Sequence, residues 1–281
     1  MFKKYKPFFK AGAIGAFAYK AAILTWFLIT IVEVACTVFL WYAVFQNSSE
    51  AVINGFTFNQ IIVYFVETNI VSFVCFGGET LWAISQEIKD GKIANELIKP
   101  ISLRGRMLMT TLGIVGMHIL IIGLPLIAIS LVIFYAIGFL TFTSIGALLF
   151  SIFSFAILVT LSIILFDAVD YFFGVCCFYT TSAWGINLAK NVIVSFLGGA
   201  ALPLSFFKFG NVDLSIVVNY LPFAGMIQNP VLALTTTYSS PAQYLHVVHT
   251  IGLALTWIII IEVINHFFFN HASKKVTVQG G

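Results

Sequence analysis

The chain has 281 residues, of which 60% are hydrophobic and 9% charged, with a formal net charge of +3. This composition excludes a soluble globular domain, in which about 25% of residues are charged. A membrane span takes about 20 mostly apolar residues, so the chain has room for roughly five to seven spans.

Residues 1–20 are predicted to form a helix that lies on the membrane surface. Phe2, Tyr5 and Phe9 recur at helical spacing, and lysines occupy the other face of the helix. Aromatic rings buried at the headgroup level and ammonium groups on anionic lipid favour this position. A frayed basic tail is the alternative.

Six apolar segments are then predicted to cross the membrane. Their ranges are 21–45, 60–84, 107–134, 144–178, 188–202 and 245–269. The end of the fourth is open, because Asp167 and Asp170 mark either a turn or polar positions within a long helix. We prefer a turn at 180–187, which places Lys190 at a membrane face instead of the bilayer centre, where a charge is costly.

The segment 203–234 is predicted to re-enter the outer leaflet as short helices. It is interrupted by Pro203, Pro222 and Pro230 and is too apolar for a free loop. Broken helices at membrane depth are tolerated where protein or water satisfies the freed backbone groups. A plain extracellular loop is the alternative.

The basic residues predict the orientation of the spans. With the N-terminus inside, all 14 lysines and arginines except Lys208 fall on the cytoplasmic side. Such a bias is a strong topology signal. Both termini are therefore expected in the cytoplasm.

One long polar segment, Gln86–Arg106, separates the second and third spans, and we call it the polar island. Pro100 disfavours helical geometry at the residue before it, and Gly91 breaks the helix upstream. Asp90 is the predicted N-terminal cap of a short helix over 92–98.

The short helix of the polar island is amphipathic. Ile93 and Leu97 share one face, beside Ala94 and Ile98, while charged side chains occupy the other. A compact apolar ridge suits docking into a groove of another protein. A solvated loop resting on headgroups is the alternative, and position alone does not decide between them.

The string EIKDGKIANELIKPIS, residues 87–102, resembles a segment of type-2 ATP-binding-cassette (ABC) exporter permeases, written I-x-x-G-x-L-x-x-x-L-x-(R/K)-P-x-(S/N). Residues 178–204 resemble the stretch after the fourth span of that family. Leu221-Pro222-Phe223, followed by Pro230, resembles its outer re-entrant region. The resemblance covers most of the chain.

The resemblance implies an all-α integral membrane protein. It implies six transmembrane helices, an N-terminal interfacial elbow helix (1–20), a permease domain (21–281) whose cytoplasmic coupling segment is 85–106, and outer re-entrant helices between spans five and six. In that family two permeases work with two separate nucleotide-binding ATPase subunits, which hold the ATP and Mg, in a bacterial cytoplasmic membrane. Whether the second permease is the same or a homologous chain stays open.

The resemblance also implies which residues shape the docking element. Those carried over from the family pattern are Ile88, Gly91, Ile93, Leu97 and Pro100. Charged residues expected to flank the contact, which the family pattern does not specify, are Glu87, Asp90, Lys92 and Glu96.

The sequence carries no GxxxxGK[ST] phosphate loop, so ATP hydrolysis is expected in a partner subunit. Neither HExxH nor GxSxG is present, and His246 and His249 lack an apparent third ligand. We predict no catalytic site, no metal site and no cofactor in this chain, and no nucleic-acid partner.

Acidic residues within or near the spans are unusual. They are Glu33, Glu67, Glu79, Asp167, Asp170 and Glu262, with Lys190 as the expected countercharge. A charge at the bilayer centre is costly, so these groups should face water, a partner or one another. One interpretation is a substrate pathway containing Glu33, Glu67 and Glu262; the other is polar packing between helices.

The leading hypothesis is therefore the permease subunit of an ABC exporter that moves an amphiphilic or cationic substrate out of the cytoplasm. The alternative is an ion- or proton-coupled secondary transporter that uses the buried acids. The lack of a clear internal repeat weakens the alternative, because many such carriers are built from repeated halves.

Overall fold

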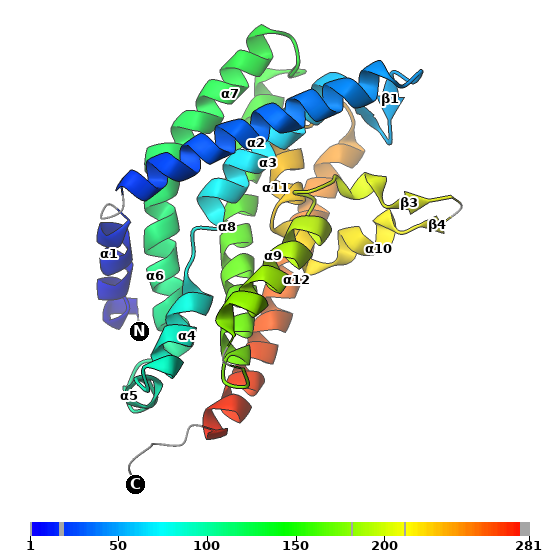
Figure 1. Ribbon diagram of the computed structural model, residues 1–281. Coiled ribbons are helices and arrows are strands. Elements are labelled where there is room, and N and C mark those ends of the chain that lie inside the picture. Colours follow the sequence, from blue (N-terminus) through cyan, green and yellow to red (C-terminus); the bar gives the residue numbers. More distant parts are fainter. Residues whose placement is uncertain (1, 17–19, 181, 211, 276–281) are drawn as a thin grey trace.

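The computed structural model describes residues 2–16, 20–180, 182–210 and 212–275. These residues form an elongated bundle of helices with two short β-hairpins (Figure 1). The elements of the first half are η1 (Phe2–Lys4), α1 (Lys6–Gly15), α2 (Lys20–Gln46), β1 (Val52–Ile53), β2 (Phe56–Thr57), α3 (Phe58–Cys75), α4 (Thr80–Lys89), α5 (Ile93–Leu97), α6 (Leu103–His118), the π-helical turn η2 (Ile119–Gly123) and α7 (Leu124–Ala136). The elements of the second half are α8 (Ile145–Cys176), α9 (Ala183–Leu197), η3 (Leu204–Phe206), β3 (Lys208–Phe209), β4 (Val212–Asp213), α10 (Ser215–Tyr220), η4 (Pro222–Gly225), α11 (Gln228–Thr235), α12 (Pro241–Ala272) and η5 (Ser273–Lys275).

Helices long and apolar enough to cross a membrane dominate the described part of the chain. There are five such stretches: Leu28–Gln46, Phe58–Lys89, Leu103–Ala136, Ile145–Cys176 and Pro241–Ala272. A helix satisfies its backbone hydrogen bonds internally, as a segment in lipid must. The predicted all-α membrane fold is confirmed, and each of these stretches overlaps one of the six predicted spans.

The remaining predicted span, 188–202, corresponds to the shorter helix α9 of 15 residues. At about 1.5 Å per residue, α9 is only about 22 Å long, less than the roughly 30 Å hydrocarbon core. It ends because Gly199 adopts a left-handed φ of +88° and the Ala200 N–H donates to the Ser195 carbonyl at 3.0 Å. A Cβ at Gly199 would lie 2.6 Å from the Tyr64 hydroxyl oxygen, so only glycine fits.

The second long stretch is interrupted at residues 76–79, between α3 and α4. The break lies close against α6: a Cβ on Gly77 would be 2.9 Å from His118 Nδ1, and one on Gly78 would be 3.0 Å from Thr111 Cγ2. The two glycines therefore permit both the interruption and the tight approach of the neighbouring helix.

The third stretch is continuous but widens into a π-helical turn, η2, before Pro125. Proline has no N–H to donate to the carbonyl of Ile121, four residues earlier. Single π turns commonly accommodate such a disruption within a helix.

Two β-hairpins stand away from α5: β1 and β2 lie at the upper right of Figure 1, and β3 and β4 project from the side of the bundle below them. The first turns at Asn54 and Gly55, whose φ values of 47° and 88° suit the type I′ turn preferred by two-residue hairpins. The second lies within the predicted re-entrant region, 203–234, which also contains four short helices. Gln228 of α11 fixes this region: its side-chain oxygen accepts from the Leu204 N–H at 2.7 Å.

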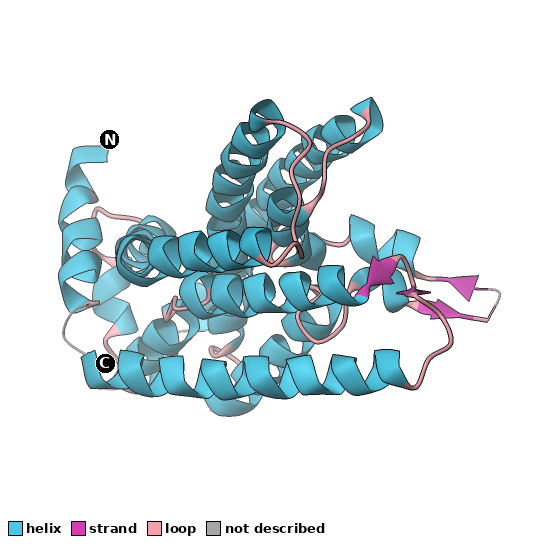
Figure 2. Ribbon diagram, turned by 90° about the horizontal axis from the view of Figure 1, so that it is seen from above, coloured by secondary structure: helices cyan, strands magenta, loops and turns pink. Residues whose placement is uncertain are grey.

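Helix α2 lies along one side of the bundle, crossing the other helices in Figure 1 and forming the lower edge of Figure 2. Only 6% of its apolar window is buried within the chain. Trp41 is the buried exception, since its ring packs on Phe65 and Phe206 at centroid distances of 5.6 and 5.4 Å. By contrast, α3 is buried along most of its length and forms the centre of the largest apolar cluster.

Helix α1 packs against α6 through backbone contact. A Cβ on Gly113 would lie 2.2 Å from the Phe9 carbonyl oxygen, and one on Gly12 would lie 2.3 Å from that of Thr110. Small residues allow helices to approach this closely. The N-terminal helix is therefore attached to the helix that follows the polar island.

Candidate functional site in the polar island

The polar island forms one end of the bundle, where α4, α5 and the start of α6 meet (Figure 1). Gly91 turns the chain after α4 with a left-handed φ of +68°, a conformation that L side chains rarely adopt. We expected Asp90 to cap the short helix, but it ends α4 instead, and Lys92 occupies the N-terminal position of α5. The Asp90 carboxylate accepts from Lys92 Nζ at 2.8 Å and from Gln86 at 3.1 Å. The hydrogen bond with Asp90 raises the pKa of Lys92.

The apolar side chains of the polar island divide into an inner and an outer set. Ile93 is 3% exposed and packs among buried residues of α6 and α8, such as Met107 and Val175. Ile98 is 83% exposed at the end of α5. The Leu97 side chain lies outside the described part of the structure. Ile93 therefore anchors α5 to the bundle, while Ile98 presents an apolar surface outward.

Arg106 joins the acidic residues of the polar island. Its Nη2 donates to Glu87 at 2.6 Å, and its Nε lies 3.2 Å from Glu96. Glu96 also pairs with Lys99. Since Glu87 is on α4, Glu96 on α5 and Arg106 on α6, these pairs hold the three helices of the polar island together.

The N-terminal segment contacts the end of the polar island. Lys4 Nζ donates to the Pro100 carbonyl at 3.2 Å. The Tyr5 hydroxyl lies 3.0 Å from Ser102 Oγ and accepts from the Ser102 N–H at 3.2 Å. The hydrogen bond from Ser102 lowers the pKa of Tyr5. Ser102 in turn caps α6 by accepting from the Gly105 N–H at 3.2 Å.

A buried ionic network lies directly behind the polar island, and its centre is Arg104 in the first turn of α6. The guanidinium contacts Asp167 of α8 and donates to Glu262 of α12 at 2.6 Å from Nη2 and 2.9 Å from Nε. Asp167 also accepts from the hydroxyls of Thr80 at 2.6 Å and Thr111 at 2.8 Å. A fork-shaped donor suits two carboxylates at once. Arg104 therefore joins α6 to α8 and α12, and Asp167 brings α4 into the same network through Thr80.

A second buried pair lies one turn further along α8. Asp170 accepts from Lys190 Nζ of α9 at 2.5 Å and from the Leu81 N–H, at the start of α4, at 2.9 Å. A backbone donor in the first turn of a helix is a favourable partner for a carboxylate. The two aspartates of α8 thus hold the N-terminus of α4, one through Thr80 and the other through Leu81.

A family model described as ABC-2 family transporter protein matches residues 31–280. This match covers most of the chain. The chain belongs to the ABC-2 transporter family. No curated protein and no solved structure matches it. As an ABC-2 permease it is a multi-pass membrane subunit, and the family is in general not catalytic.

The three acids assigned to a substrate pathway lie on different helices of this ABC-2 permease. Glu33 is exposed on α2, and its carbonyl accepts from Thr37 Oγ1 at 2.8 Å. Glu67 is fully buried on α3, where Ser130 of α7 donates to its Oε1 at 2.6 Å. Glu262 is paired with Arg104. Each carboxylate thus has its own surroundings, and the pathway stays a prediction.

Sequence reasoning found Lys190 as a countercharge but missed Arg104. In the sequence Arg104 stands within the polar island and counts only among the basic residues that predict topology. One available signal was Ser102, a residue type favoured at helix N-termini, which places Arg104 in the first turn of a helix. Asp167 and Asp170, three apart on one helical face, repel each other, which also indicates that cationic partners face them.

Proposed function

We propose that this chain is the permease subunit of an ATP-driven exporter in a bacterial cytoplasmic membrane. In this proposal two permeases, identical or homologous, pair in the lipid bilayer and bind two separate ATPase subunits. ATP and Mg are held by those subunits. ATP binding closes them, and the movement opens a path between the permeases for an amphiphilic or cationic substrate.

The observation that carries this proposal is the construction of α5. It is a short helix at one end of the bundle, between two long apolar stretches, and its neighbour Ile98 is almost fully exposed. The ion pairs of Arg106 and the buried side chain of Ile93 fix α5 to α4 and α6. A force applied at α5 is therefore transferred to both helices instead of being absorbed by a flexible loop.

The coupling surface of this proposal combines the exposed apolar residues at the end of α5 with the charged residues around them. Ile88, Gly91, Ile93 and Pro100 shape the segment, and Leu97 and Ile98 provide apolar contact. The charged groups around them are Glu87, Asp90, Lys92 and Glu96. An apolar anchor surrounded by polar groups is the usual arrangement of a protein interface.

The proposed topology has six crossings, with α9 and the region 203–234 together completing the fifth. Both termini and the polar island then lie in the cytoplasm. The basic residues of α1 and the polar island favour this orientation, since cytoplasmic segments carry an excess of lysine and arginine.

Replacement of Ile98 by aspartate tests the docking role. The permease is expressed with the ATPase encoded for it and purified through a tag on the permease. Ile98→Asp should lose the copurifying ATPase, and so should Leu97→Asp. Ile137, which is 55% exposed in the link between α7 and α8, provides the matched control, and Ile137→Asp should retain the ATPase. Full ATPase recovery and full ATP-driven transport with Ile98→Asp would refute the proposed coupling surface.

One observation favours the secondary transporter as the second candidate. Oε2 of Glu67 is buried and has no hydrogen-bond partner in the described part of the chain. Such a carboxyl group is a candidate for proton or cation binding within a membrane. Proteoliposomes that contain this chain alone distinguish the two functions: transport driven by a pH gradient without ATP supports the carrier.

A further inference from the structure

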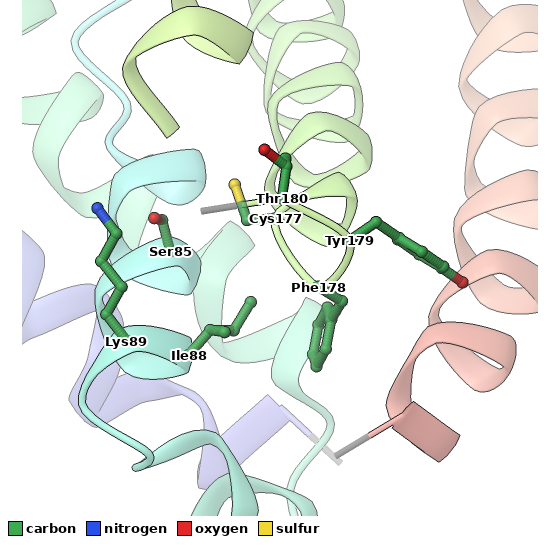
Figure 3. A pocket seen from close by; sticks show the side chains of 7 residues that line it. All are labelled: Ser85, Ile88, Lys89, Cys177, Phe178, Tyr179 and Thr180. Carbon is green, nitrogen blue, oxygen red and sulfur yellow. The ribbon is translucent and has the colours of Figure 1, made fainter. Parts of the chain in front are cut away.

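A cleft of about 600 Å³ opens beside the polar island, between α4 and the turn that joins α8 to α9 (Figure 3). The residues that line it are Ser85, Ile88, Lys89, Cys177, Phe178, Tyr179 and Thr180. Ser85, Ile88 and Lys89 come from the last two turns of α4, and the others follow the end of α8. The cleft does not include the ionic network of Arg104.

Lys89 is the charged group of this lining. Its side chain extends along α4 toward Ser85, which brings the amino group beside the cleft (Figure 3). Within the described ranges Lys89 forms no ion pair, whereas the other basic residues of the polar island each face a carboxylate: Lys92, Lys99, Arg104 and Arg106. Lys89 therefore has its charge available for an anion.

The opposite wall of the cleft adds a hydroxyl donor. Thr180 Oγ1 accepts from the Ser182 N–H at 3.2 Å, and its own hydrogen can be donated to a ligand. The rest of the lining is mainly apolar, with Ile88 and Phe178 half-buried in the bundle. A cation and a hydroxyl over an apolar floor match an anionic head joined to an apolar chain.

The charged side chains around the cleft favour an anion as well. No acidic side chain is among its lining residues. Asp90 follows Lys89 in the chain but is paired with Lys92. The cleft also lies at the ends of α4 and α8, where apolar helices give way to polar segments and lipid headgroups are found.

We propose that this cleft binds the phosphate of an anionic lipid headgroup. Lys89 supplies the charge, Thr180 donates a hydrogen bond, and the acyl chain runs along Ile88 and Phe178. A water-soluble phosphate ester shares the headgroup chemistry, and the experiment below separates the two sources. The proposal does not depend on the exporter function.

The test measures lipid binding to the full-length permease in a neutral detergent by native mass spectrometry. Phosphatidylglycerol should bind more tightly than phosphatidylcholine with the same acyl chains. Lys89→Gln should weaken phosphatidylglycerol binding about fivefold, the effect expected of one lysine beside an anionic surface. The matched control is Lys99→Gln, which removes the same charge from the polar island outside the cleft, leaves the Asp90–Lys92 pair intact and should leave the affinity unchanged.

A charge-conserving variant and a competition experiment with a soluble phosphate ester complete the test. Lys89→Arg keeps the charge and should bind phosphatidylglycerol like the unchanged protein. If it does, a loss of binding in Lys89→Gln is due to the missing charge and not to misfolding. Glycerol phosphate that binds with the same dependence on Lys89 and displaces the lipid assigns the site to soluble phosphate esters; failure to compete assigns it to lipid. Equal weakening by Lys89→Gln and Lys99→Gln, or none with either, would overturn the proposal. Loss of the ATPase with lipid binding intact would instead assign Lys89 to docking and also overturn it.

Discussion

Replacement of Arg104 by methionine should destabilise the bundle far more than loss of a surface cation. The substitution leaves Asp167, whose side chain is fully buried, without its cation, and it also removes the partner of Glu262, whose side chain is about one-third exposed. Removal of one partner from a buried ion pair costs about 3–5 kcal/mol. Asp167 keeps the hydroxyls of Thr80 and Thr111, and Glu262 can rehydrate, so we expect the lower end, about 3 kcal/mol.

Lys99→Met provides the matched control for this experiment. Lys99 is half-exposed and pairs with Glu96, so the loss of its charge should cost about 1 kcal/mol or less. Unfolding in detergent, followed by tryptophan fluorescence as a denaturing detergent is added, measures both variants under one condition. A loss for Arg104→Met no larger than that for Lys99→Met would refute the inference that the network is buried and stabilising.

A combined variant separates charge from packing. Arg104→Met with Asp167→Asn and Glu262→Gln removes all three charges, so no unpaired carboxylate remains. Neutral replacement of a whole buried network is often close to neutral in stability, and the combined variant should recover much of the loss. The single change Asp167→Asn should cost more than Glu262→Gln, because the Asp167 side chain is fully buried.

Three further substitutions test other parts of the structure. Gly113→Ala should displace α1, because its Cβ would meet the Phe9 carbonyl at 2.2 Å, and should raise protease cleavage after α1; Gly116→Ala, with nothing within 4 Å, should not. Gly91→Val should lower the stability of the polar island by about 1 kcal/mol or more through its positive φ, as seen in faster hydrogen exchange of α5. Glu67→Gln should reduce transport of cationic cargo relative to neutral cargo; equal transport of both would remove Glu67 from the pathway.

Hydropathy was sufficient to predict the long apolar helices, because each needs only a composition and a length. It was not sufficient for α9, whose end depends on Gly199 and its approach to Tyr64 from a different helix. The sequence predicted this span over 188–202, whereas the helix runs from Ala183 to Leu197 and ends where Gly199 meets Tyr64.

In the polar island, too, the features that depend on neighbouring residues could be predicted, and those that depend on contacts with other helices could not. Gly91 and Pro100 bound the short helix from local backbone chemistry, and the structure has α5 between them. The direction of Ile93 was not readable, because a helix of five residues has no second turn to define an inner face. Arg104 required knowledge of which spans are neighbours, since its partners are 63 and 158 residues away.

The contacts of α8 explain how the proposed exporter would connect the polar island to the region 203–234. Its 32 residues extend about 48 Å. Asp167 and Asp170 hold Arg104 and the start of α4, while Ser162, five residues before Asp167, donates to the Met226 carbonyl beside η4. A displacement of α5 would therefore reach α8 through α4 and α6, and α8 contacts the region 203–234 through Ser162 and Met226. The break at residues 76–79 interrupts the helical hydrogen bonds between α3 and α4, so α4 can follow α5 and α8 while α3 stays in the core.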